Sequence, residues 1–145
     1  FVSALKLYFR KSSKAQKESR NGEENPINAI RNSVDTTIDQ CAEGKGCLAV
    51  NSLIEVAPFD AEIDRILKQF RQHLDKHLAG LVDEAKSAKL VSGSVDTKEA
   101  VRMISIFLHG LSANMAAGMS ASKARALLHG QLDLVLTSRK KSNRS

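Results

Sequence analysis

The 145-residue sequence lacks tryptophan and contains only two prolines, eight glycines and one tyrosine. Aromatic residues make up 4% of the chain and β-branched runs are few, which disfavours both a sheet protein and a Pro- or Gly-rich disordered chain. Alanine, leucine and lysine are abundant instead, and all three favour helices. Together with an apolar fraction of 42%, this composition predicts one all-α domain with a substantial core.

Cysteine and long apolar runs are also scarce. Two cysteines, Cys41 and Cys47, are too few for the disulfide framework of a secreted domain, and residues 1–20 lack the cleavage pattern of a signal peptide. The longest uncharged stretch, 103–122, contains serine, histidine and asparagine, which favours a helix buried among other helices over a membrane span. We therefore expect a cytoplasmic protein with no membrane partner.

Patterns typical of catalysis are missing as well. The sequence shows no Ser-His-acid spacing, glycine-rich phosphate loop or Glu-x-x-His pair, so we expect no enzymatic activity, catalytic residue or cofactor. His73 and His77 are spaced i,i+4, as in some zinc sites, but no third ligand follows by spacing and we expect no metal. The formal net charge of +6 includes a basic end, 139–145, which we interpret as a solvated tail.

Hydrophobic periodicity predicts about six helices. Asn25 with Pro26 marks the start of the second helix, Asp60 caps the long fourth, and Asp96 or Thr97 caps the fifth. The expected segments are a first helix over 1–19, three middle helices within 25–92, two C-terminal helices within 97–138 and the tail over 139–145.

The short third helix, within GCLAVNSLIEVAPFD (46–60), is almost entirely apolar yet contains Asn51, Ser52 and Glu55. These three fall within one sector of about 100 degrees on a helical wheel. A helix that is apolar almost all round is buried almost all round, so its polar sector must face partners, water or a cavity. Two interpretations stay open: polar groups that orient a mostly apolar ligand, or hydrogen bonds within a tight helix junction.

The two C-terminal helices are apolar over well over half of their circumference, which one packing face does not explain. We expect them to contact their own domain on one side and a second copy on the other, forming a four-helix dimer interface. The alternative is an adaptor module, without a small-molecule pocket, that grips the helices of another protein. A homodimer with an internal pocket would distinguish the first interpretation from the second.

Two motifs give the sequence a resemblance to a known family. The first is Gly46-Cys47-Leu48 with Asn51 and Glu55, followed by Ala57-Pro58-x-Asp60; the second is Leu-His-Gly-Leu (108–111) followed by Ala117-Gly118. In this order, the motifs resemble those of the C-terminal domain of TetR-family transcriptional repressors. The resemblance covers essentially all 145 residues. Members of that family carry an N-terminal helix-turn-helix domain, which has no counterpart before Phe1, so operator DNA would be reached only through that absent domain.

The resemblance implies a homodimer through the last two helices, a cavity among the middle helices for a largely apolar effector of unknown identity, and a first helix that links this cavity to the DNA-binding domain. Binding would act by population shift between two arrangements of the first helix. The candidate ligand-binding residues are Ile38, Asn51, Glu55, Phe70, Leu74, His77, Met103, Phe107 and Leu111. The candidate dimer-interface residues are Leu108, Met115, Leu127, Leu128, Leu134 and Val135.

The two cysteines leave a further alternative. Cys47 falls at an expected helix N-terminus near Lys45, an environment that lowers a thiol pKa and raises reactivity. Cys41 lies six positions earlier, across a glycine-containing turn. The pair therefore suggests a thiol-based sensor of oxidants or electrophiles, and the plainer interpretation is that both are small buried hydrophobic residues.

Overall fold

The computed structural model describes residues 1–43 and 46–137, so the basic tail and Lys45 lie outside the described residues. The described chain contains six α-helices, one short 3-10 helix and no strand, which confirms the expected all-α class. None of its helices is long and apolar enough to cross a membrane. The elements are α1 (Val2–Glu18), α2 (Pro26–Glu43), α3 (Leu48–Glu55), η1 (Ala57–Phe59), α4 (Ala61–Ser87), α5 (Thr97–Ala116) and α6 (Ala121–Leu136).

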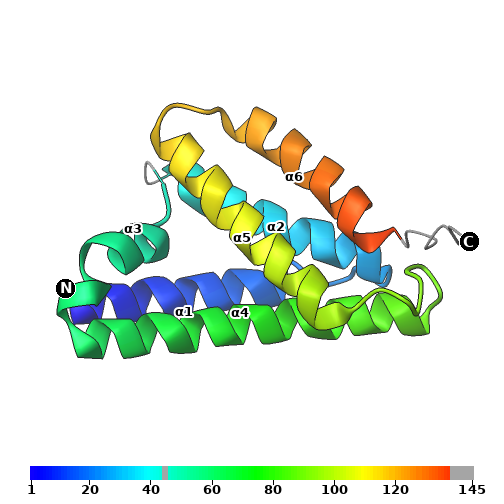
Figure 1. Ribbon diagram of the computed structural model, residues 1–145, viewed down its shortest axis with the longest axis horizontal. Helices are drawn as coiled ribbons and strands as arrows, with labels where there is room; N and C mark the ends of the chain where they lie inside the picture. The colour runs from blue at the N-terminus through cyan, green and yellow to red at the C-terminus, as the bar shows by residue number, and fades with distance from the viewer. Residues whose placement is uncertain (44–45, 138–145) are drawn as a thin grey trace, which may run out of the picture.

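The long helices surround α2, which packs against α1, α4, α5 and α6. Figure 1 shows α1 and α4 side by side along one edge, with α5 crossing above them and α6 on the opposite edge. The short helix α3 and η1 lie at the end where α1 begins, and both pack against α4. The space between α3 and the long helices is therefore enclosed by elements from most of the chain.

Side-chain caps fix where four of the helices begin. The side-chain oxygens of Asn25, Asp60, Asp96 and Ser120 each accept a hydrogen bond from a backbone N–H in the first turn of the helix that follows. Each such cap contributes about 1 kcal/mol. The caps expected at Asn25 and Asp60 are confirmed, and Asp96 is the cap of α5.

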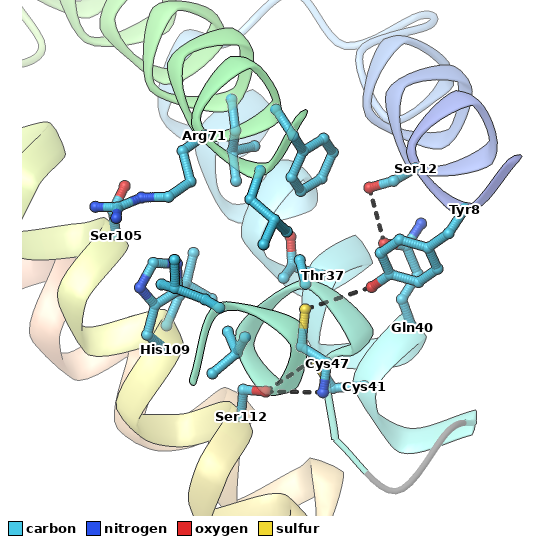
Figure 2. A pocket seen from close by; sticks show the side chains of 17 residues that line it. Tyr8, Ser12, Thr37, Gln40, Cys41, Cys47, Arg71, Ser105, His109 and Ser112 are labelled. Carbon is cyan, nitrogen blue, oxygen red and sulfur yellow. Dashed lines mark hydrogen bonds between the residues drawn. The ribbon is translucent and has the colours of Figure 1, made fainter. Parts of the chain in front are cut away.

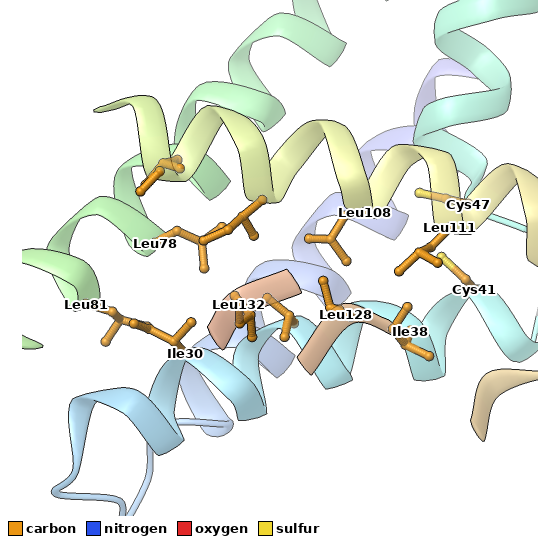
Figure 3. Close-up of a cluster of buried hydrophobic side chains, with 14 of the residues drawn as sticks. Ile30, Ile38, Cys41, Cys47, Leu78, Leu81, Leu108, Leu111, Leu128 and Leu132 are labelled. Atoms are coloured by element: carbon orange, nitrogen blue, oxygen red, sulfur yellow. The ribbon is translucent and has the colours of Figure 1, made fainter. Parts of the chain in front are cut away.

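The hydrophobic core runs along α2 and draws side chains from all six helices. Its largest fully buried side chains include Ile30, Ile38, Leu78, Leu128 and Leu132 (Figure 3). Burying an aliphatic side chain of this size contributes about 1.5–3 kcal/mol, so this core accounts for much of the stability of the fold.

Helix α1 is held to α2 by polar as well as apolar contacts. The buried amide of Gln16 donates 3.1 Å hydrogen bonds to the Ser33 carbonyl and the Thr37 hydroxyl, and it accepts one from the Ser33 hydroxyl. The Ser12 hydroxyl donates to the Gln40 amide oxygen at 3.1 Å. Because such bonds are directional, they fix the register of α1 along α2.

Candidate functional site

A cavity of about 40 Å³ lies between α1, α2, α3, α4 and α5 (Figure 2). Its middle is apolar and polar groups gather at its two ends. A water molecule occupies roughly 30 Å³ of liquid, and pockets for drug-sized ligands measure about 300–1,000 Å³. The described volume therefore fits only a very small molecule, and a larger ligand requires the helices to separate. The apolar residues of the middle are Val50, Leu53, Leu67, Phe70, Leu74 and Leu108.

The first polar end joins α1, α2, α3 and α5 around two thiols. The hydroxyl of Tyr8 lies 3.4 Å from the Cys47 sulfur. The Ser112 hydroxyl accepts a 2.9 Å hydrogen bond from the backbone N–H of Cys47 and lies 3.7 Å from the Cys41 sulfur. Figure 2 shows these side chains converging at the start of α3. One cavity end thus connects α1 directly to Cys47 through Tyr8.

This environment shifts the pKa values of the two thiols in opposite directions. A hydrogen bond from the Cys41 thiol, partly opposed by burial, lowers the pKa of Cys47 to about 6, and the Tyr8 hydroxyl and the N–H groups of Val50 and Ala49 add to the effect. The hydrogen bond to Cys47 and burial both raise the pKa of Cys41, while burial above all raises that of Tyr8. Cys47 is therefore the group that ionises first, and both cysteines are free and buried.

The second polar end lies between α4 and α5. The Ser105 hydroxyl donates a 2.6 Å hydrogen bond to the Asp75 carboxylate, and Arg71 and His109 line the cavity beside Ser105. Burial lowers the pKa of His109, the charge of Arg71 lowers it further, and Asp75 opposes both effects. The lowered pKa favours the neutral imidazole, in which one ring nitrogen carries a proton and the other accepts a hydrogen bond.

The polar sector of α3 lies outside this cavity. Asn51 and Glu55 are exposed to solvent, whereas Ser52 is buried without lining the cavity. The cavity side of α3 is formed by Val50 and Leu53. The reason is that this short helix packs on the surface of α4 and α5, so its apolar face turns inward and most of its polar sector faces water.

The other candidate ligand-binding residues are divided among three environments. Phe70 and Leu74 line the cavity. Ile38 and Leu111 belong to the hydrophobic core, and His77 lies in a groove between α1 and α4. Met103, 49% exposed, and Phe107, half-buried, lie on α5 away from the cavity. Helical periodicity shows that these residues share a face of their helix. It does not show which neighbouring helix, or the cavity, that face contacts.

The candidate dimer residues also divide. Leu108, Met115 and Leu128 are buried within one chain, and Leu108 lines the cavity. Leu127 and Leu134 are 44% and 70% exposed, and Val135 is half-buried. Both faces of α5 and α6 are apolar, so the sequence did not separate the inner face from the outer one. We call the exposed apolar set Met103, Leu127 and Leu134 the outer α5–α6 face.

Most of the lining residues were not predicted from the sequence, among them Tyr8, Arg71, His109 and Ser112. One signal was available: Tyr8, Ser12 and Gln16 follow each other at i,i+4 spacing, which places a polar stripe on one face of the first helix. Within the part of the chain that the structure describes, no group of three or more His, Cys, Asp or Glu residues is placed to hold a metal ion.

Comparison with known proteins defines the class of fold. No protein-family model and no curated protein matches the sequence. Among solved structures, the chain resembles a protein from Rhodococcus sp. assigned to the TetR family of transcriptional regulators, with a TM-score of 0.78 at 20% identity, over 93% of this chain and 72% of that one. The expected TetR-like fold is therefore confirmed.

Proposed function

We propose that this chain is the effector-binding and dimerisation core of a TetR-like transcriptional regulator. The observation that carries the proposal is the mostly apolar cavity enclosed by five helices, which reaches α1 through Tyr8 and Ser12. The TetR-like fold supports the same function. A small, largely apolar effector occupies the cavity, and the resulting movement of α1 repositions operator-binding domains carried ahead of it.

The contact between Phe70 and Phe9 supports a route from the cavity to α1. Phe70 lines the cavity, and its ring stacks on that of Phe9 in α1 with the centroids 4.0 Å apart and the planes 6° from parallel. A ligand that widens the cavity displaces Phe70 and with it α1. To shift the two arrangements from 1:99 to 99:1, the ligand must favour one of them by about 5.5 kcal/mol.

The outer α5–α6 face supports the dimerisation part of the proposal. Its three large apolar side chains are exposed on two adjacent helices, and Gly110 and Gly130 have no atom near the position of an added Cβ. Apolar side chains next to small residues allow helices of a second copy to approach closely, which is how a four-helix interface excludes water. This interface holds the two operator-binding domains at a fixed spacing.

A thermal-shift screen of small apolar and amphiphilic compounds tests effector binding. We expect some compounds to raise the melting temperature of the wild type by about 5 °C at saturating concentration. Leu74→Trp, which fills the cavity, should abolish the shift, whereas Leu7→Trp adds the same side chain at an exposed position of α1 and should preserve it. Leu53→Trp serves as a second cavity block if Leu74→Trp does not fold. Compounds that stabilise all variants equally would contradict binding in the cavity.

The thiol pair supports a second candidate function, the sensing of a small oxidant. The Cys47 thiolate attacks the outer oxygen of a hydroperoxide, giving a sulfenic acid and releasing an alkoxide that takes up a proton as the alcohol. The Cys41 thiol then attacks the sulfenic sulfur, forming a disulfide and releasing water. The hydrogen bond between Tyr8 and Cys47 is lost, so the oxidation state is transmitted to α1.

Mass spectrometry after stoichiometric hydrogen peroxide tests this second function. The wild type should lose two hydrogens per chain, and Cys41→Ser should instead gain one oxygen at Cys47. Oxidation at methionine with both cysteines still reduced would exclude thiol sensing.

A further inference from the structure

We propose that the effector is an amphiphilic carboxylate that enters between α4 and α5, binds Arg71 through its head and inserts its apolar tail into the cavity. The inference rests on the proposed function and names the ligand class of the same site. It follows from the way the cavity meets a second, larger hollow on the surface.

A groove of about 640 Å³ lies between α4 and α5. Arg71 and Ser105 line both this groove and the inner cavity, so these two side chains form the boundary between them. Arg71 is exposed, and its long side chain is free to swing without disturbing the core. The boundary is therefore the place where a ligand passes from solvent to the apolar interior with the smallest rearrangement.

The charges along the groove favour an anion. Arg71, Lys76, Lys98 and Arg102 line it together with a single carboxylate, that of Asp75, which already accepts the Ser105 hydroxyl. Among the described residues Arg71 forms no ion pair, whereas Arg102 faces Glu99 at 3.7 Å. A carboxylate matches the planar guanidinium of Arg71 in a bidentate pair, which is a stronger contact than a neutral hydroxyl makes.

The inner side of the same boundary completes a site for the head. His109 and Arg71 lie on the same side of the cavity in Figure 2, with Ser105 beside the guanidinium. An imidazole always carries a proton on at least one ring nitrogen, so His109 supplies an N–H donor to the carboxylate in addition to the pair with Arg71.

The remaining walls suit an alkyl or aryl tail. Beyond Arg71 and His109 the cavity is lined by Leu67, Phe70 and Leu74 of α4 and by residues of α3 and α5. A tail of several carbons exceeds the described 40 Å³, so its entry must displace Phe70 or α3. Anchoring the head at Arg71 directs that displacement toward the Phe9–Phe70 stack, which is the contact with α1.

Isothermal titration calorimetry with octanoate and octan-1-ol, which differ in the head group alone, tests the proposal. We expect the wild type to bind octanoate about tenfold more tightly than octanol, because a charge-assisted pair replaces a neutral hydrogen bond. Arg71→Gln should weaken octanoate binding about tenfold and leave octanol within about twofold. Arg65→Gln, an exposed position on α4 that lines none of these hollows, is the matched control and should leave both affinities unchanged.

The outcomes separate this inference from the proposed function. Equal affinities for octanoate and octanol, both lost in Leu74→Trp, would overturn the carboxylate site while leaving the cavity as the effector site. Octanoate binding that persists in Leu74→Trp would place the anion on the surface groove alone and overturn the inserted tail. Failure of the wild type to bind octanoate at millimolar concentration would overturn the carboxylate proposal, and the compound screen would still report on the cavity.

Discussion

At the scale of single residues, Gly46 shows how the segment before α3 is constrained. Its φ of +111° is one that side chains rarely adopt, and an added Cβ would lie 3.0 Å from the Ala116 Cβ. The close approach to α5 places the Cys47 N–H on Ser112 and so builds the thiol end of the cavity. Glycine is required here for both conformation and space.

We predict that Gly46→Ala lowers the free energy of unfolding by about 1–3 kcal/mol, because strain and the contact with Ala116 act together. Gly80→Ala is the matched control: it lies inside α4 with open space around an added Cβ, and should raise stability by about 0.5–1 kcal/mol. Urea denaturation of both variants measures the difference. Equal effects of the two substitutions would contradict the requirement at Gly46.

The ionisation of Cys47 gives a second prediction at this scale. Because its pKa is lowered to about 6, the thiolate fraction and the rate of alkylation by iodoacetamide should rise as pH increases through about 6 and level off by about 7.5. Tyr8→Phe removes one hydrogen bond to the sulfur and should move the midpoint upward. Peptide mass spectrometry assigns the modified cysteine. A midpoint near the ordinary thiol pKa, about 8.5, would contradict the lowered value.

At the scale of elements, local sequence chemistry predicted where three of the helices begin. Asn25 with Pro26, Asp60 and Asp96 mark helix starts, because capping depends on the residue and its immediate neighbours. The orientation of α3 was not predictable in the same way. Its wheel showed that Asn51 and Glu55 share a sector, but only the packing of α3 over α4 and α5 decides that this sector faces water.

The same limit explains why most residues that line the cavity were not predicted from the sequence. Phe70 and Leu74 line the cavity because they belong to the inner stripe of α4, which is well defined in the sequence. Tyr8, Arg71 and His109 reach the cavity from three helices, and nothing local in the sequence states that these helices meet.

The polar contact between α1 and α2 leads to a prediction at this scale. Gln16→Ala should lower stability by about 1–3 kcal/mol, because the hydroxyls of Ser33 and Thr37 lose their buried partner. Lys11→Ala, on the exposed side of α1, is the control and should change stability by no more than about 0.5 kcal/mol. Thermal unfolding reports both values. A Gln16→Ala protein as stable as the control would show that the buried bonds do not hold α1 in place.

At the scale of the whole molecule, the proposed function requires two copies to meet through the outer α5–α6 face. We predict that Leu134→Glu converts the dimer to a monomer, because a charge at the centre of an apolar interface stays unpaired. Ile54→Glu is the control, since Ile54 is similarly exposed, at 66%, but lies on α3. Sedimentation velocity distinguishes the two states. Dissociation by Ile54→Glu, with Leu134→Glu still dimeric, would place the interface elsewhere.

Native mass spectrometry of the purified chain tests most directly whether it is a dimeric effector-binding core, since one spectrum reports the number of subunits and any bound small molecule. We expect a species at twice 15.8 kDa that carries the added mass of a co-purified effector. The same measurement on Leu74→Trp should show the dimer without that added mass. A wild-type monomer at 15.8 kDa with no added mass, giving the same spectrum as Leu134→Glu apart from the substitution, would contradict a dimeric effector-binding core.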